Sequence, residues 1–304
     1  TSYSNSGIQT IPFYIFYSMF GFQRIGDLAW AAGDSRSRGF LLGATAGRTT
    51  LNGEGLQHED GHSHLLSATI PNCISYDPCF SYELAVIIQN GLERMIKNQE
   101  DVFYYITIMN ENYSHPEMPK NISEDIIKGI YKYSESKASG PKVQLMGSGV
   151  ILREVIGAAS ILEKDFNISS TIYSVTSFTE VRRNALDIQR WNMLNPDKTE
   201  KKSILDEIIL DLESPIITAT DYMKSFAEQI ATFLPNKFIS LGTDGFGRSD
   251  SREALRDFFE VDRNHIVIAA LKALTEKQEI EKSVLLSAIK KYKIMNDKPN
   301  PVSL

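Results

Sequence analysis

Residues 52–64 hold the densest group of reactive side chains in the sequence, which reads Asn-Gly-Glu-Gly-Leu-Gln-His-Glu-Asp-Gly-His-Ser-His. This stretch contains three of the five histidines, three carboxylates and three glycines. Apolar segments flank it on both sides, which is typical of a binding or catalytic loop carried by a rigid scaffold. Imidazole and carboxylate side chains offer acid-base chemistry, metal ligation or a merely solvated turn, and all three readings stay open at this point.

Residues 58–62, His-Glu-Asp-Gly-His, match the zinc-protease motif H-E-x-x-H letter for letter. That motif needs both histidines on one helical face, four residues apart, with the glutamate as general base. Here Asp-Gly is a turn dipeptide, and glycines at positions 53, 55 and 61 interrupt a helix. We therefore predict no metal ligands, and a zinc hydrolase that uses the His58/His62 pair, with His64 as a third ligand, is kept only as an alternative.

The bulk composition of the 304 residues is that of a soluble globular protein, with 42% hydrophobic and 23% charged residues. A net charge of −6 lacks the basic footprint that nucleic-acid binding requires. No apolar run reaches the roughly 20 residues of a membrane-spanning helix. Because Cys73 and Cys79 are the only two cysteines and no secretory signal precedes them, we expect a reducing, cytoplasmic location.

The elements around residues 52–64 follow from the hydrophobic periodicity. Residues 11–32 predict a largely buried helix with Pro12 in its first turn, and residues 39–45 predict a buried strand directly before the loop. A helix over residues 81–97 and a strand over residues 102–109 come next. This alternation builds a parallel sheet, in which ligands bind beyond the carboxyl ends of the strands, so residues 52–64 and 110–113 are expected at such an edge.

A second α/β unit is expected after a polar segment, of which we take residues 120–140 as a linker. Beyond it, strands are predicted at 142–147, 171–175, 216–219 and 238–241, and helices at 150–165, 180–194, 203–212 and 222–233. The glycine-rich run 242–249 lacks the spacing of a phosphate-binding motif. We expect Ser249 or Asp250 to cap the helix that follows it.

Five segments together closely resemble the homodimeric pyruvate dehydrogenase family, the thiamine-diphosphate-dependent first components of pyruvate dehydrogenase complexes. They are residues 13–30, 51–64, 110–113, 191–194 and 242–250. The loop also resembles that of the wider transketolase superfamily. The resemblance implies an α/β chain with an incomplete pyrimidine-binding domain of the thiamine-diphosphate fold over residues 1–119. A linker over residues 120–140 and a transketolase-type carboxyl-terminal domain over residues 141–304 would follow.

The resemblance also implies roles for individual residues. Phe20 would stack on the aminopyrimidine of the cofactor, and Tyr17 would form hydrogen bonds near cofactor and substrate. His58 would donate a proton to the substrate oxygen or intermediate, and Glu54 would orient groups around it. Imidazole suits this acid role because its unperturbed pKa is about 6.5. His64, which matches the superfamily's loop histidine, and His62 are placed in second rank.

The activity that the resemblance implies is decarboxylation of pyruvate on thiamine diphosphate and magnesium, followed by reductive acetylation of a lipoyl group. The implied partners are a second copy of the chain and dihydrolipoamide acetyltransferase. The family's diphosphate-binding domain, with its magnesium ligands, has no counterpart in this sequence, which begins at Thr1. We therefore expect a carboxyl-terminal fragment that is inactive alone and that binds the cofactor weakly or not at all. A non-catalytic module that dimerises or docks within a complex is the alternative.

Overall fold

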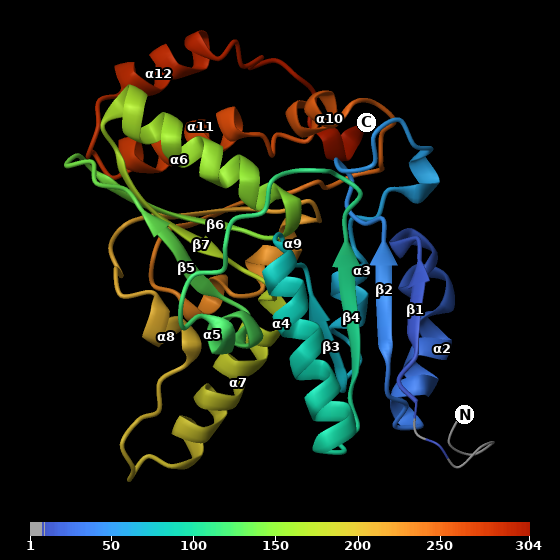
Figure 1. The fold of residues 1–304 in the computed structure, drawn as a ribbon. Coiled ribbons are helices and arrows are strands. Elements are labelled where there is room, and N and C mark those ends of the chain that lie inside the picture. The colour runs from blue at the N-terminus through green and yellow to red at the C-terminus, as the bar shows by residue number, and fades with distance from the viewer. Residues whose placement is uncertain (1–7, 9) are drawn as a thin grey trace.

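The computed structural model describes residue 8 and residues 10–304, and it contains two sheets that lie side by side (Figure 1). The start of the first expected domain, residues 1–7 and 9, lies outside the described residues. In the described part of the chain, no helix is long and apolar enough to cross a membrane.

The first sheet has four parallel strands in the order β1-β2-β4-β3. These strands are β1 (Phe13–Phe16), β2 (Phe40–Ala44), β3 (Cys73–Tyr76) and β4 (Phe103–Ile108). The helices of this half are α2 (Phe22–Asp34), α3 (Ser63–Ser67) and α4 (Ser81–Leu92), which a π-helical turn extends over Glu93–Lys97. The strands predicted over residues 39–45 and 102–109 and the helix predicted over 81–97 are therefore confirmed.

The helix predicted over residues 11–32 is wrong in its first half. Phe13 pairs with Phe40 in the parallel register of β1 and β2, a 3-10 turn follows over Ser18–Phe20, and only α2 is α-helical. Aromatic residues three and four apart fit a helix, but a short aromatic run also suits a strand when a partner strand is available. Tyr14 and Ile15 are 58% and 64% exposed, so β1 is an edge strand and not a buried helix.

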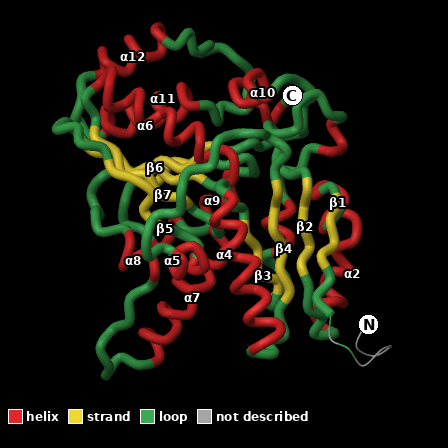
Figure 2. The backbone as a smooth tube through the Cα atoms, in the orientation of Figure 1, coloured by secondary structure: helices red, strands yellow, loops and turns green. Residues whose placement is uncertain are grey.

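The second sheet has five strands in the order β5-β7-β6-β8-β9, and β5 runs antiparallel to β7. The strands are β5 (Tyr131–Glu135), β6 (Lys142–Gly147), β7 (Ser169–Ser174), β8 (Ile216–Ala219) and β9 (Phe238–Leu241). One face packs against α6 (Leu152–Phe166), α11 (Arg263–Glu276) and α12 (Lys282–Lys291). The other face packs against α7 (Phe178–Leu194), α8 (Ile204–Ile208) and α9 (Lys224–Glu228) (Figure 2). The predicted alternation of strands and helices is confirmed.

Three details of the second half differ from expectation. Residues 120–140, expected to be a linker, contain α5 (Ser123–Lys128) and β5, which supplies the edge of the second sheet. The exposed residues of β5 are polar, so the sequence pattern of this strand resembles that of a loop. The helices predicted over residues 203–212 and 222–233 are both shorter, as α8 and α9, and a separate 3-10 turn over Ala231–Phe233 follows α9. Ser251 rather than Ser249 or Asp250 caps α10 (Arg252–Phe258), since Ser251 Oγ accepts from the N–H of Ala254 at 3.2 Å. The domain limits themselves stay a prediction.

Glu83 on α4 joins the two sheets through a wholly buried carboxylate. It accepts hydrogen bonds from Tyr131 Oη on β5 at 2.6 Å and from Ser174 Oγ on β7 at 2.7 Å. It also accepts from the N–H groups of Cys79 at 2.6 Å and Phe80 at 2.9 Å, at the start of its own helix. Because a buried polar group without a partner is costly, these four bonds favour one arrangement of the sheets.

Asp77, which follows β3, is a second buried carboxylate at the junction. It accepts from Thr107 Oγ1 at 2.7 Å in the first sheet. From the second sheet it accepts from Ser148 Oγ at 2.8 Å and Tyr222 Oη at 3.3 Å. Burial raises the pKa of Asp77 to about 7, although these hydroxyl groups oppose the shift.

Replacing Glu83 should weaken the junction. Glu83→Ala leaves several buried donors without an acceptor, so we expect the free energy of unfolding to fall by about 3 kcal/mol in urea titrations followed by circular dichroism. Glu93→Ala is the matched control, because Glu93 makes an exposed pair with Lys97 at 2.8 Å and should cost less than about 1 kcal/mol. Equal losses in the two variants would contradict a structural role for Glu83.

The raised pKa of Asp77 predicts a pH dependence of stability. Between an ordinary value of 3.8 and the folded value of about 7, the folded chain holds a proton that the unfolded chain has lost. This contribution to stability is present at low pH and is lost as the pH rises through that window. Asp77→Asn should therefore reduce the fall in unfolding free energy by up to about 1.4 kcal/mol per pH unit. Urea titrations of both proteins from pH 4.5 to 7 measure how the free energy of unfolding depends on pH. The same dependence in Asp77→Asn and in the wild type would count against a protonated Asp77.

Candidate functional site

The predicted site residues gather at the carboxyl ends of β1 and β2. Tyr17 follows β1, and Phe20 ends the 3-10 turn after it. The site loop, residues 45–62, leaves β2 and runs to α3, and a short 3-10 helix over Leu56–His58 lies within it. Ligands of parallel α/β sheets bind at such strand ends, so the arrangement agrees with the expected location of a site.

Tyr17, Phe20 and His58 form one aromatic cluster. The ring of His58 lies 5.0 Å from that of Tyr17 and 5.3 Å from that of Phe20, and the rings of Tyr17 and Phe20 are 5.9 Å apart. Glu54 Oε2 lies 3.3 Å from His58 Nδ1, close enough to orient the ring. Tyr17 is 40% exposed, so the cluster is open to solvent. The structure thus brings all the first-rank residues together.

His64 lies in the junction between the sheets and not in the aromatic cluster. It is wholly buried, its ring stacks on Phe226 at 4.7 Å, and it meets Tyr222 edge-on at 4.8 Å. Its Nε2 is 3.0 Å from Thr107 Oγ1. Burial lowers the pKa of His64 to about 4, so the ring is neutral at physiological pH and packs as an aromatic residue.

His62 is half-buried at the end of the site loop, and burial lowers its pKa. Its backbone N–H donates to Asp60 Oδ1 at 3.0 Å. The zinc alternative fails on this local geometry, because His58 ends a 3-10 helix whereas His62, with a φ of −145°, precedes α3. The two imidazoles therefore share no helical face. Within the described residues, the group that could hold an ion comprises Asp257, Asp262 and His265, which lie on other elements.

The second sheet holds the first part of the site loop through Asp221, which lies just beyond β8 and is wholly buried. Asp221 Oδ1 accepts from the N–H of Thr49 at 3.0 Å and from its Oγ1 at 2.7 Å. Asp221 Oδ2 accepts from Thr50 Oγ1 at 2.6 Å, and Arg252 Nε donates to the carbonyl of Thr50 at 2.7 Å. Asp221 was not among the predicted site residues, although a carboxylate beyond the predicted strand 216–219 was a usable signal.

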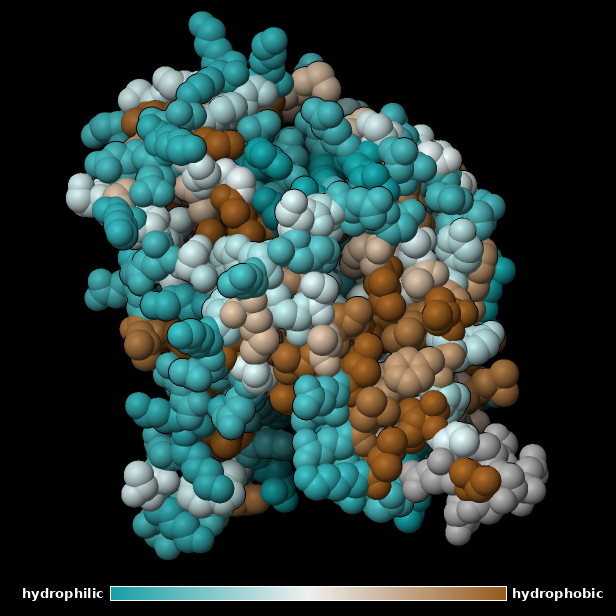
Figure 3. All heavy atoms as spheres, in the orientation of Figure 1, coloured by the Kyte–Doolittle hydropathy of each residue, from teal (hydrophilic) through white to brown (hydrophobic). Residues whose placement is uncertain are grey.

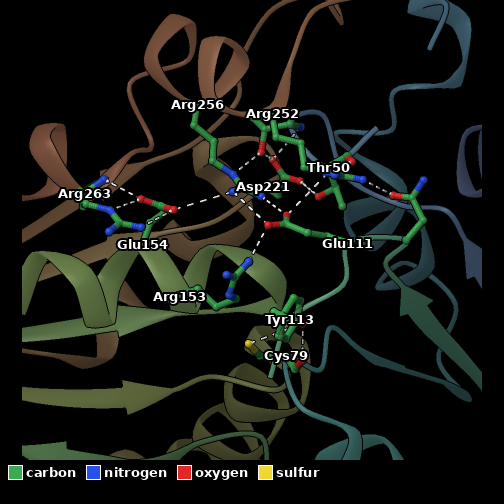
Figure 4. Close-up of polar contacts among 12 residues, drawn as sticks. Thr50, Cys79, Glu111, Tyr113, Arg153, Glu154, Asp221, Arg252, Arg256 and Arg263 are labelled. Carbon is green, nitrogen blue, oxygen red and sulfur yellow. Dashed lines mark hydrogen bonds and ion pairs between the residues drawn. The ribbon is translucent and has the colours of Figure 1, made fainter. Parts of the chain in front are cut away.

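An ion cluster extends this contact across the junction (Figure 4). Arg256 pairs with Glu111, which follows β4, and lies 3.7 Å from Glu154 on α6. Glu111 also pairs with Arg153 at 2.5 Å, and Glu154 pairs with Arg263 at 2.9 Å. Burial opposes ionisation of Glu111, but Arg256 and Arg153 outweigh it and lower the pKa of this carboxyl. The polar run 110–113, expected at the sheet edge, therefore contributes a structural ion pair.

Two buried side chains support the remainder of the site loop. Asp60 accepts from Gln23 Nε2 on α2 at 2.9 Å and from the N–H of Ser63 at 3.0 Å, so it ties the loop to its own domain. Arg48 Nη1 donates to the carbonyl of Thr243 in the second half of the chain. Burial lowers the pKa of Arg48, although the surrounding carboxylates, Asp60 first among them, oppose the shift.

Two family models match the chain. The model described as the pyruvate dehydrogenase E1 component middle domain matches residues 1–116, which include the first sheet. The model described as the transketolase-like TK C-terminal domain matches residues 129–262, which include the second sheet. Residues 117–128, which include α5, lie between the two matches.

Solved transketolase structures resemble the fold. The enzyme from Campylobacter jejuni superposes with a TM-score of 0.65 at 16% identity, over 86% of this chain and 35% of that chain. A structure titled as the inactive β4 tetramer of a split-gene transketolase superposes with a TM-score of 0.60 at 15% identity. That match covers 90% of this chain and 79% of that chain. At such low identity these likenesses support the fold alone, which is the predicted α/β fold.

Curated sequences named pyruvate dehydrogenase E1 component are much more similar. The protein of Cupriavidus necator is 58% identical over 306 residues, which cover 100% of this chain and 34% of that protein. The protein of Escherichia coli K12 is 58% identical over 303 residues, which cover 99% of this chain and 34% of that protein. The chain thus spans about a third of the length of these relatives. The first sheet thus matches the middle domain of the pyruvate dehydrogenase E1 component, the second matches a transketolase-like C-terminal domain, and the whole chain is similar to a third of curated pyruvate dehydrogenase E1 components.

Proposed function

We propose that this chain forms one wall of the active site of a thiamine-diphosphate-dependent pyruvate dehydrogenase. The observation that carries the proposal is the meeting of Tyr17, Phe20 and His58 at the carboxyl ends of β1 and β2. Identity of 58% to pyruvate dehydrogenase E1 components supports it. Because those relatives are about three times as long, we propose the activity for a protein of their length and inactivity for residues 1–304 alone.

The residues present fit the aminopyrimidine end of thiamine diphosphate. Phe20 and Tyr17 offer aromatic surface for stacking. Thr45 Oγ1, directly after β2, is a buried polar atom without a hydrogen-bond partner within the described chain, as expected where a polar ligand is received. When bound, thiamine diphosphate supplies the reactive carbon that makes decarboxylation of a 2-oxoacid feasible. We propose that the diphosphate and its magnesium are held by residues outside this sequence.

In such a site the chain's own residues bind, orient and move protons. His58 donates to the substrate oxygen on which negative charge develops, and Glu54, 3.3 Å away, orients the imidazole for that contact. Tyr17 donates a hydrogen bond to the cofactor or the substrate, and Phe20 stacks on the pyrimidine and so fixes its plane. We propose pyruvate as the substrate and the lipoyl group of a dihydrolipoamide acetyltransferase as the acyl acceptor. His64 acts only through packing.

We also propose that two copies pair through the first sheet. Phe13, Tyr14 and Ile15 on β1 are 47–64% exposed, and in Figure 3 apolar side chains gather over β1, β2 and β4. An exposed apolar patch beside an edge strand marks an interface. A non-catalytic module that dimerises or docks would use the same surface. The presence or absence of catalysis distinguishes that alternative from the proposed enzyme.

His58→Ala tests the catalytic role. In a protein extended to the length of the relatives, we expect the variant to lower kcat for pyruvate-dependent release of carbon dioxide by about 100-fold or more, with a smaller change in KM. The change is expected mainly in kcat because His58 would donate its proton in the transition state. His115→Ala, which removes an exposed histidine on another loop, is the control and should keep full activity. Unchanged release by His58→Ala would exclude the proposed role.

Ile15→Lys tests the interface. Ile15 is 64% exposed on the edge strand, and a lysine there places charge in an apolar contact. Sedimentation velocity should show a dimer for the chain and a monomer for Ile15→Lys. Leu210→Lys, at a residue that is 80% exposed in the second half, should leave the dimer intact. A monomeric wild-type chain at micromolar concentration argues against pairing of this chain by itself.

A further inference from the structure

We propose that Glu59 is a positioning residue, which ties the turn that carries His58 to a glycine-rich loop of the second sheet. This glycine-rich loop, residues 242–250, connects β9 to α10. Its sequence, Gly-Thr-Asp-Gly-Phe-Gly-Arg-Ser over residues 242–249, lacks the spacing of a phosphate-binding motif. In Figure 1 the site loop, drawn in blue, lies against the orange chain around α10. The inference rests on the proposed function only in that His58 is assigned to catalysis.

The tie is a hydrogen bond from the backbone of the glycine-rich loop. The N–H of Arg248 donates to Glu59 Oε2 at 2.7 Å. Glu59 directly follows the 3-10 helix over Leu56–His58, where its own N–H donates to the carbonyl of Leu56 at 3.3 Å. The N–H of His58 donates to the carbonyl of Gly55 at 2.9 Å, which completes the turn. A displacement of Glu59 therefore displaces the backbone of the residue before it.

Close packing makes this tie specific. A Cβ atom at Gly247 would lie 2.7 Å from Cβ of Glu59 and 3.1 Å from the carbonyl oxygen of Leu56. Real Cβ atoms do not approach so closely, so a side chain at position 247 would push the two loops apart. The contact between the two loops thus requires a glycine at position 247.

The glycine-rich loop is itself supported from its far side by the chain's last residues. Gly245 has a φ of +102°, and a Cβ there would lie 2.7 Å from the carbonyl oxygen of Pro301. Lys298 Nζ donates to the carbonyl of Asp257 on α10 at 2.5 Å. The guanidinium of Arg248 lies 5.5 Å from the centre of the Phe258 ring, also on α10. Glu59 therefore holds a loop that is itself fixed to a helix.

The raised pKa of Glu59 makes glutamine its conservative replacement. The side chain is buried, and the charged groups nearest to it are Arg48, Asp221 and Arg248. Burial raises the pKa of Glu59 to about 8, although the hydrogen bond from Arg248 opposes the shift. At neutral pH the side chain is therefore mainly the neutral acid, with one oxygen accepting from Arg248. Glutamine reproduces that neutral shape and keeps the acceptor, whereas alanine removes it.

The test reads the position of His58 in the 304-residue chain itself. His58 lies 5.0 Å and 5.3 Å from the rings of Tyr17 and Phe20, so ring currents make its imidazole NMR signals sensitive to small displacements. In histidine-labelled protein, Glu59→Ala and Gly247→Ala should move the His58 signals and leave those of His265 in place. Glu59→Gln should leave His58 where it is. Gly26→Ala is the control for an added methyl group, since nothing lies within 4 Å of that position.

The activity arm uses the protein extended to the length of the relatives. We expect Glu59→Ala to lower kcat by up to about 100-fold with little change in KM, and Glu59→Gln to restore it, because misplacement of a catalytic group by about 1 Å costs that much. Unmoved His58 signals in Glu59→Ala, or equal displacement in Glu59→Gln, overturn the inference. If Glu59→Ala does not fold, Gly247→Ala decides, since it keeps Glu59 and strains only the contact. An extended wild-type protein without activity refutes the proposed function, whereas the NMR result still decides the role of Glu59.

Discussion

The buried carboxylate of Asp221 is the contact on which the candidate site depends. Removed from water, it needs donors, and Thr49 and Thr50 of the site loop supply them from as far as 172 residues away in the sequence. Burial still raises its pKa, and the charge of Arg256 opposes that shift. A loop that leaves the first sheet thus takes its path from the second sheet, so the aromatic cluster around His58 belongs to both.

His58 and His64 show how burial separates side chains of one type. His58 keeps a solvent-accessible ring beside a carboxylate and two aromatic rings, which suits proton transfer. His64, six residues further, is fixed between Phe226 and Tyr222, where a charge would have no water to solvate it. The short helix α3 turns one histidine inward, while the 3-10 turn before it leaves the other at the surface.

Local patterns predicted the parts of the fold that depend on neighbouring residues. The apolar runs that form β2, β4 and β8 are buried, so their composition was sufficient, and the position of the loop at a strand end followed from the alternation. The aromatic spacing of residues 13–20 was ambiguous, and pairing with β2 decided it. Asp221, Arg256 and Glu59 could not be assigned from the sequence, because each acts through a partner more than a hundred residues away. The family resemblance predicted roles for His58 and Glu54, but not the contacts that hold them in place.

The buried junction has a consequence for how the chain folds as a whole. Glu83, Asp77 and His64 lie in the part of the chain that the first family model matches, and each has a partner in the part that the second model matches. Expressed alone, the first half would expose these carboxylates and this imidazole, and the second half would expose the hydroxyl groups and the ring that contact them. Two different family models match the two sheets, but the shared buried contacts lead us to expect that both sheets unfold together. Amide hydrogen exchange should then report a single global opening for both.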